Sequence, residues 1–308
     1  MAYQTDIRES TRIGFARGET EGRGRVLFAA REPGRLLVVT DATPAHPVSF
    51  RWPDQPSDMG TLSWAGASQK ISEALTGLAN SETGELHIAE DAKALGRVGP
   101  EWVSIVVHVL DGGAANVPAP GTEVDIAIDA DHRGKLNAAH TAAHLAAFGL
   151  NRALAPFWTK EGATIDSLGA PDFDKEAIVS SQLSPEGATD TYRLGKSLRK
   201  KGFDHEAAAG GLPAITDAVN ATLATWLAQP ADVTLEPAES LLDTRRVWRC
   251  LLDGRPAEIF CAGTHVANLS SIAAANVTIA QTEDGLRMKT IVRTAAAAGL
   301  PPSARPRW

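Results

Sequence analysis

The sequence predicts an α+β protein with a β-rich, barrel-like N-terminal domain over residues 1–128 and a two-layer α/β sandwich over residues 129–308. Short alternating apolar segments dominate the first domain, whereas a long alanine-rich helical segment opens the second. Strand-like segments return after a second helix, an order that is typical of an α+β sandwich. A chain of 308 residues is also long enough to form two hydrophobic cores.

The first domain is expected to consist mainly of strands. Residues 25–29 and 35–40 should form a hairpin, because Glu32-Pro33-Gly34 places proline and glycine where turn geometry favours them. Residues 71–80 are expected to be helical. Further strands are predicted over residues 85–89, 102–110 and 124–128, with a turn at Asp111-Gly112-Gly113.

The pattern changes near residues 129–131, where an aspartate can cap a long helix that continues to Leu150. Its many alanines favour the helix and keep it thin, so that a sheet can approach closely. A second helix is expected over residues 212–229, and residues 180–208, which are polar and lack periodicity, are expected to form an inserted loop. Strands are predicted over residues 233–235, 246–252, 257–261, 276–280 and 286–294.

Composition indicates a cytoplasmic protein. The chain has only two cysteines, Cys250 and Cys261, and no basic start followed by an apolar run, so neither export nor a disulfide framework is expected. Cys250 lies in a strand pattern and is expected to be a small core residue. The longest apolar stretches, such as residues 102–110, are shorter than a membrane span requires, and no membrane partner is expected.

The net charge of −7 argues against broad nucleic-acid binding, which needs a surplus of Lys and Arg, and no DNA partner is expected. Any RNA contact must therefore be local. The candidate clusters are Arg193, Lys196, Arg199, Lys200 and Lys201, then Arg245, Arg246 and Arg249, and finally Arg287, Lys289 and Arg293. Each cluster alone is more typical of a solvated surface. Within the 180–208 insertion, the alternatives are a lid, an RNA contact and a surface excursion.

Two pairs of residues predict a metal site. His140 and His144 lie four apart in the first long helix, so both imidazoles project from one face. Cys261 and His265 are also four apart and follow a predicted strand. One thiolate and three imidazoles are a ligand set suited to zinc. The alternatives are a purely structural zinc, unrelated core histidines with a buried thiol, and Cys261 as a nucleophile with His265 as its base.

These motifs resemble a known family. His140-Thr141-x-x-His144 and Cys261-x-Gly263-Thr264-His265-Val266 are similar to the HTxxH and CxGTHV signatures of the alanyl-tRNA synthetase editing domain, and the layout resembles the AlaX-type stand-alone deacylases. Gln55-Pro56-Ser57-Asp58-Met59-Gly60 resembles the end of the family's glycine-rich loop, and the likeness extends roughly from Val26 to Arg293. Leu110-Asp111-Gly112-Gly113 also falls in family order.

The chain departs from the family at several positions. Trp52-Pro53-Asp54 stands where the family usually has glycines, and Ala262 replaces a further glycine. Both changes stiffen the backbone near the expected pocket and bear on amino-acid specificity. Ile259 occupies the position where the related threonyl-tRNA synthetase editing domain has an aspartate, which argues against a carboxylate base there.

The resemblance implies an editing deacylase that uses zinc to cleave the ester of mischarged aminoacyl-tRNA, by default Ser- or Gly-charged tRNA(Ala). A threonine-like amino acid on tRNA(Thr), such as fluorothreonine, is the alternative substrate. Two alternative functions fall outside this class: a zinc hydrolase of free esters or amides, and a non-catalytic, zinc-stabilised RNA-binding module. The expected catalytic and metal-binding residues are His140, His144, Cys261 and His265, and the expected substrate contacts are Thr141, Thr264, Gln55 and Asp58, with Thr159 a weaker candidate.

Overall fold

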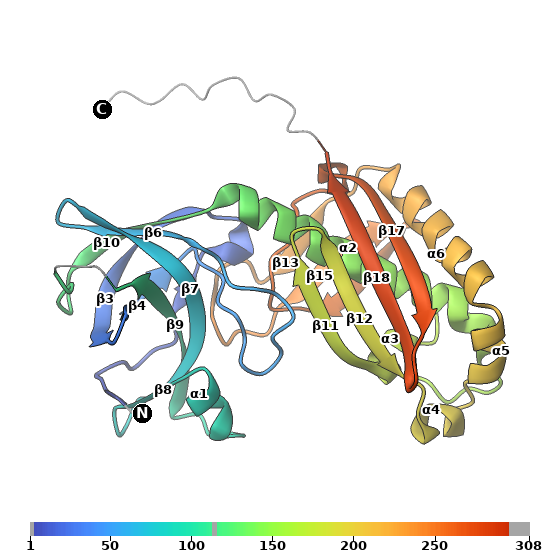
Figure 1. Cartoon of the computed structure of the whole chain (residues 1–308), viewed down its shortest axis with the longest axis horizontal. Coiled ribbons are helices and arrows are strands. Elements are labelled where there is room, and N and C mark those ends of the chain that lie inside the picture. The colour runs from blue at the N-terminus through green and yellow to red at the C-terminus, as the bar shows by residue number, and fades with distance from the viewer. Residues whose placement is uncertain (1–2, 113–115, 296–308) are drawn as a thin grey trace.

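The computed structural model describes residues 3–112 and 116–295 and has a mixed, strand-rich α/β architecture with four sheets among those residues (Figure 1). The coarse expectation of a mixed α and β protein is therefore confirmed. Gly113 of the expected turn and the chain from residue 296 onward lie outside the described residues. No helix in residues 3–112 and 116–295 has the length and apolar character needed to cross a membrane.

Six antiparallel strands of the N-terminal part form a closed ring. The pairing order is β7 (Ala67–Asn80), β6 (Gly60–Trp64), β10 (Glu123–Ile128), β3 (Glu21–Glu32), β4 (Arg35–Thr40) and β9 (Trp102–Asp111). β9 pairs back with β7, which closes the ring. Every strand of the ring contributes to one apolar cluster, which includes Leu36, Leu62 and Ile126. The expected hairpin of β3 and β4 is confirmed.

Shorter elements surround the ring. β8 (Glu85–Ile88) pairs with the far end of β7, and β1 (Tyr3–Gln4) pairs with β8. β2 (Arg12–Ile13) lies between β5 (Ala42–Thr43) and β14 (Ser240–Leu241), so a strand from late in the chain joins the N-terminal part. The remaining short helical elements here are η1 (Phe15–Arg17) and α1 (Glu90–Ala94).

The expected helix over residues 71–80 is wrong, because this segment forms most of β7, from its fifth residue to its end. Buried residues at 71, 74, 75 and 78 imitate the spacing of one helix face. In the structure a register shift between Ile71 and Glu73 breaks the alternation of the strand, which pairs with β9 on one edge and, at Gly77 to Ala79, with β8 on the other. The helical spacing is thus produced by a bulge in a strand buried on both faces.

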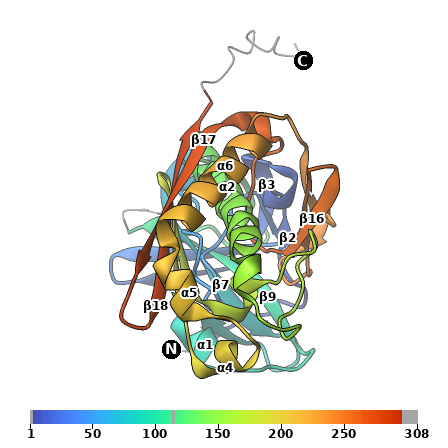
Figure 2. The same cartoon turned by 90° about the vertical axis from the view of Figure 1, so that its right-hand side faces the viewer.

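The C-terminal part is built around α2 (Ala130–Leu154), whose start is capped by the Asp129 side chain as expected. A four-stranded antiparallel sheet has the order β11 (Ile178–Ser184), β12 (Gly187–Arg193), β18 (Gly285–Thr294) and β17 (Ile272–Gln281). α2 and α6 (Leu212–Leu227) contact each other and pack on this sheet (Figure 2). A three-stranded sheet of β13 (Val233–Glu236), β15 (Val247–Leu252) and β16 (Arg255–Phe260) completes this part, together with η2 (Ala155–Phe157) and η3 (Leu269–Ser271).

One large hydrophobic cluster joins these layers. It includes Ala142 and Ala146 of α2, Trp248 of β15 and Val277 of β17. The small alanine side chains let the strands approach the helix backbone, as the sequence indicated. Cys250 is buried in the same cluster and is a core residue, as expected.

The expected loop over residues 180–208 is also wrong. The structure places there the hairpin of β11 and β12, followed by α4 (Lys196–Lys200) and α5 (His205–Gly210), with α3 (Phe173–Ala177) just before it. The inward-facing residues of β12 are Ala188, Asp190 and Tyr192. Because the polar Asp190 is one of them, the segment lacks the regular alternation of apolar and polar residues that predicts a strand. Pairing with β18, about a hundred positions further along the chain, supplies the second edge that stabilises this hairpin.

Candidate metal centre

α2 presents His140 and His144 on one face, one helical turn apart, with ring centroids 4.7 Å apart. The face that carries them also carries the alanines that pack against the sheet, so both rings point into the protein interior. His140 is 3% exposed. The expectation that one helix offers both imidazoles together is met by this geometry.

Cys261 and His265 lie in the irregular segment between β16 and η3. Gly263, in the middle of this segment, packs directly against the His140 ring and the Gln55 amide, so a side-chain carbon at this position would collide with both. The absence of a side chain at Gly263 therefore lets the segment approach α2 closely enough to bring its two ligands to the helix.

The four residues converge. Their ligand atoms all lie within 4.8 Å of one another, and the group could hold a metal ion. The Cys261 Sγ atom lies 3.5 Å from His140 Nε2 and 3.2 Å from His265 Nε2. His144 Nε2 is buried without a hydrogen-bond partner among the described residues. A buried nitrogen left unpaired is costly unless it has a ligand to bind, so the residues fit a metal ion.

Gln55 orients His140 from the N-terminal part of the chain. Its Oε1 atom accepts hydrogen bonds from Thr264 N (3.0 Å) and from His140 Nδ1 (2.9 Å), and its Nε2 atom donates to Thr264 Oγ1 (2.8 Å). Since the amide oxygen accepts, His140 must carry its proton on Nδ1, and its Nε2 lone pair faces Cys261. Such outer contacts fix the tautomer and direction of metal-binding histidines.

Thr141 performs the same task for His265. Its Oγ1 atom accepts from Val266 N (3.3 Å) and lies 3.2 Å from His265 Nδ1. A proton on Nδ1 leaves the Nε2 lone pair of His265 directed toward Cys261. Thr141 thus uses its hydroxyl to connect the helix to the segment after β16.

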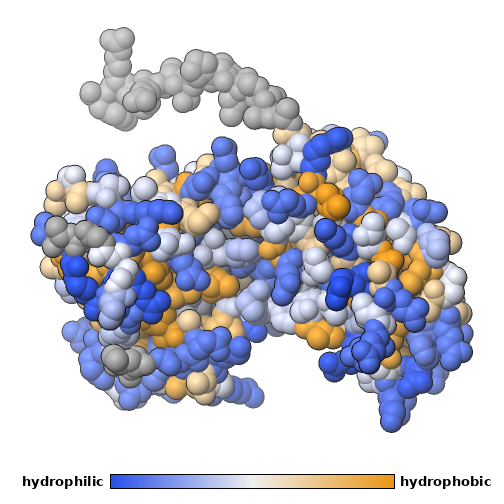
Figure 3. All heavy atoms as spheres, in the orientation of Figure 1, coloured by the Kyte–Doolittle hydropathy of each residue, from blue (hydrophilic) through white to orange (hydrophobic). Residues whose placement is uncertain are grey.

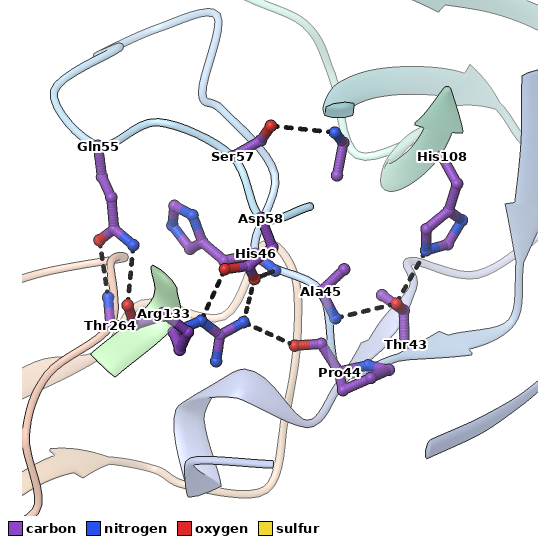
Figure 4. Close-up of polar contacts among 11 residues, drawn as sticks. Thr43, Pro44, Ala45, His46, Gln55, Ser57, Asp58, His108, Arg133 and Thr264 are labelled. Atoms are coloured by element: carbon purple, nitrogen blue, oxygen red, sulfur yellow. Dashed lines mark hydrogen bonds and ion pairs between the residues drawn. The ribbon is translucent and has the colours of Figure 1, made fainter. Parts of the chain in front are cut away.

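A buried ion pair fixes the loop that carries Gln55, residues 44–59, against α2. Both Nε and Nη2 of Arg133 donate to the Asp58 carboxylate, and Nη2 also donates to Pro44 O at 3.0 Å (Figure 4). Asp58 also accepts from His46 N at 2.5 Å. Both charged side chains are 2% exposed, so each depends on the other for its charge to be tolerated.

The sequence interpretation missed Arg133, although a signal was present. A cation near the N-terminus of a helix is electrostatically unfavourable unless a carboxylate balances it. Arg133 also precedes His140 by seven positions and therefore lies on the same helix face. The loop is held at a second point, where Leu183 N of β11 donates to Asp54 O at 2.8 Å.

The expected substrate contacts are placed differently. Gln55 and Asp58 are each 1% exposed, Thr141 is 0% exposed and Thr264 is 2% exposed, and their polar atoms are engaged within the protein. In this structure these side chains position the metal-binding group and its loop, and their expected contact with substrate stays a prediction. Thr159 donates to Gly202 O and does not line the cavity described next.

A cavity of about 380 Å³ lies beside the four ligands, and His140, His144, Cys261 and Gly263 line it. Carboxylates of Asp54, Asp174 and Asp190 line it as well, together with Trp52 and Phe260. Figure 3 shows the molecule hollowed between its N-terminal and C-terminal parts. The cavity therefore combines a metal-binding group with an acidic lining.

Burial governs the charge of these acids. It raises the pKa of Asp174 to about 7, with nearby Asp190 acting in the same direction, and raises that of Asp190 to about 6. Tyr192 Oη donates to Asp174 at 2.9 Å. The sequence interpretation missed Asp174 and Asp190. The signal for Asp190 was its place in an alternating strand, which the expected loop concealed.

The ligands themselves are electrically neutral in this structure. Burial lowers the pKa of His140, His144 and His265, so the three imidazoles are unprotonated near pH 7, the state in which they bind metals. Burial also raises the pKa of the Cys261 thiol to about 12. Zinc binding would displace the proton of this thiol, and a thiolate held by zinc is less available for attack, which argues against covalent catalysis by Cys261.

No protein-family model matches the chain, and no curated protein matches it. The likeness to the editing-domain family therefore depends on the motifs, of which the geometry brings four residues together as possible metal ligands.

Proposed function

We propose that this protein is a cytoplasmic, zinc-dependent aminoacyl-tRNA deacylase of the AlaX type, which removes wrongly attached amino acids from tRNA. The observation that carries the proposal is the convergence of His140, His144, Cys261 and His265 beside a cavity with an acidic lining. The finer two-domain layout, a barrel-like part followed by an editing sandwich, belongs to the same proposal.

The donor set favours zinc. One thiolate and three imidazoles form the tetrahedral nitrogen and sulfur set that zinc prefers over hard cations. A zinc ion held by these residues supplies a Lewis acid that polarises an ester carbonyl and acidifies water. His140, His144, Cys261 and His265 would hold the ion, and a catalytic role would require room for water or substrate beside them. Gln55 and Thr141 meanwhile hold His140 and His265 in their ligating tautomers.

The acidic lining favours an aminoacyl ester over a simple ester. An aminoacyl group carries an ammonium beside the bond that is cleaved, and Asp54, Asp174 and Asp190 offer carboxylates in the same cavity as the metal ligands. Because burial opposes the ionisation of Asp174 and Asp190, a nearby cation strongly stabilises their charged forms. These residues therefore hold and orient the amino group while the ester carbonyl faces the ligands.

Ser- or Gly-charged tRNA(Ala) is the default substrate, and one observation favours a specialised alternative. Trp52 and Asp54 replace the glycines usual in the family and line the cavity, and Asp54 Oδ2 lies 3.8 Å from His140 Nε2. A larger, polar lining suits a threonine-like amino acid such as fluorothreonine on tRNA(Thr), because added hydrogen-bonding groups select for a hydroxyl.

The decisive experiment incubates the zinc-loaded protein with seryl, glycyl, alanyl, threonyl and fluorothreonyl esters on matched tRNAs and on short ester analogues without tRNA. We expect rapid loss of one mischarged ester and retention of the correct one. Full activity on the short analogues would identify a free-ester hydrolase, and tRNA binding without ester loss would identify a non-catalytic RNA-binding module.

A further inference from the structure

A second cavity, of about 420 Å³, adjoins the metal-binding group. It shares His46, Ser49 and the Phe260-Cys261-Ala262 segment with the acidic cavity, so the two meet at one of the four ligands. The second cavity differs from the first in charge and in its aromatic content.

Three arginines line this second cavity: Arg51, Arg245 and Arg246. None of them takes part in an ion pair within the described parts of the chain, although the chain as a whole carries a charge of −7. Asp243 is the one carboxylate among the lining residues, and its Oδ2 accepts a hydrogen bond from Ser10 Oγ.

Arg246 is the most unusual of the three. It is 2% exposed, its Nη1 atom donates to Leu241 O at 3.1 Å and Ser240 Oγ at 3.3 Å, and its Nε atom has no partner among the described residues. A buried guanidinium with an open donor and no paired carboxylate is costly unless an anion binds to it. Burial accordingly lowers the pKa of Arg246.

Aromatic rings accompany these cations. Phe260 is 60% exposed, and the Arg245 guanidinium lies 3.5 Å from the centroid of its ring. The Arg51 guanidinium lies 5.6 Å from the centroid of Phe50. Bases of single-stranded RNA stack on aromatic rings and on guanidinium planes, and phosphates pair with arginine.

We propose that this cavity binds the 3′-terminal nucleotide of the RNA substrate, with its phosphate at Arg246 and Arg51 and its base on the stack of Arg245 and Phe260. The assignment rests on the proposed function. An aminoacyl-tRNA has a cationic end and an anionic end on either side of its ester, and the two cavities, which share Cys261, offer the opposite charges. The ester is thereby placed at the metal ligands.

The test measures binding of adenosine 5′-monophosphate, adenosine and inorganic phosphate to the zinc-loaded protein by calorimetry. We expect the nucleotide to bind more tightly than either fragment. Arg245→Ala and Phe260→Ala should each weaken nucleotide binding about tenfold, while zinc content stays at the parent level. Arg249→Ala and Leu251→Ala, at exposed positions on the neighbouring strand β15, are the matched controls and should bind like the parent.

Equal binding of phosphate and nucleotide would overturn the base contact, and absence of nucleotide binding, or equal binding by all variants, would overturn the proposal. Because Arg246→Ala can disturb folding, the exposed Arg245 and Phe260 carry the test. If these variants weaken nucleotide binding but the parent cleaves no aminoacyl ester, the nucleotide site is supported and the proposed deacylase activity is contradicted. If the parent cleaves an aminoacyl ester and none of the variants changes the rate, the deacylase activity is supported and the nucleotide site is contradicted.

Discussion

Gln55 Oε1 lies 2.9 Å from His140 Nδ1, although 85 positions separate the two residues in the chain. The same amide bonds both the backbone and the hydroxyl of Thr264. One side chain from the N-terminal part therefore connects both halves of the metal-binding group.

Gln55→Leu should weaken zinc binding by about 10- to 100-fold, because His140 loses the acceptor that fixes its tautomer. Competition with a zinc chelator of known affinity measures the change. Gln281→Leu, at an exposed position at the end of β17, is the control. Parent affinity in the Gln55 variant would show that the amide does not support the metal-binding group.

His144→Ala should abolish zinc binding and ester cleavage and lower the melting temperature, since the ion loses a ligand and the helix face gains a cavity. Elemental analysis and thermal denaturation are the measurements. His132→Ala, earlier on the same helix and outside the group, should keep the zinc content, the ester cleavage and the melting temperature of the parent. Full metal content and turnover in the His144 variant would contradict the ligand assignment.

Removal of either partner of the buried ion pair should destabilise the fold by about 3–5 kcal/mol, because the remaining charge has no counter-ion. Chemical denaturation of Asp58→Leu and Arg133→Met tests this. The double variant should recover part of the loss, since it leaves no buried charge. A double variant whose loss equals the sum of the two single losses would show that the residues act independently.

Asp190 should make the fold less stable as the pH rises. Burial raises its pKa in the folded protein from 3.8 to about 6, so the folded state binds the proton more tightly than the unfolded state. The contribution of Asp190 to the free energy of unfolding is therefore greatest below about pH 4. It falls by on the order of 3 kcal/mol as the pH rises to about 6.

Asp190→Asn removes this dependence, and its stability relative to the parent should be greater at pH 7.5 than at pH 4. Denaturation at both values measures it, with the exposed Asp217→Asn as control. An identical offset at the two values would show that Asp190 ionises normally in the folded protein.

The basic residues in α4 and directly after it are the next candidates for RNA contact. Lys201 forms an ion pair with Glu176 at 2.5 Å, whereas Arg199 and Lys200 are exposed. Reversal of Arg199 and Lys200 to Glu should weaken tRNA binding and flatten its salt dependence while zinc content is unchanged. Lys70→Glu with Lys135→Glu is a matched charge change elsewhere. Equal binding by both double variants would identify α4 as ordinary surface.

Local patterns in the sequence determined the parts of this protein that depend on neighbouring residues. The spacing of His140 and His144, the cap at Asp129 and the hairpin of β3 and β4 each follow from contacts within a few positions, and the structure has all three. The pairing of Cys261 with His265 as ligands was readable for the same reason.

Tertiary structure decided everything that depends on distant partners. The 71–80 segment resembles a helix until β9 pairs along one of its edges and β8 pairs at the far end of the other, and the β11–β12 hairpin needs β18 for its second edge. The contacts of Gln55 with His140 and of Asp58 with Arg133 were not predicted, because a polar side chain in a loop carries no local mark of its partner. Hydrogen bonds and ion pairs between remote residues form only when packing of the apolar layers has brought them together. Apolar periodicity shows which face of an element is buried, but it does not show which distant element will cover that face.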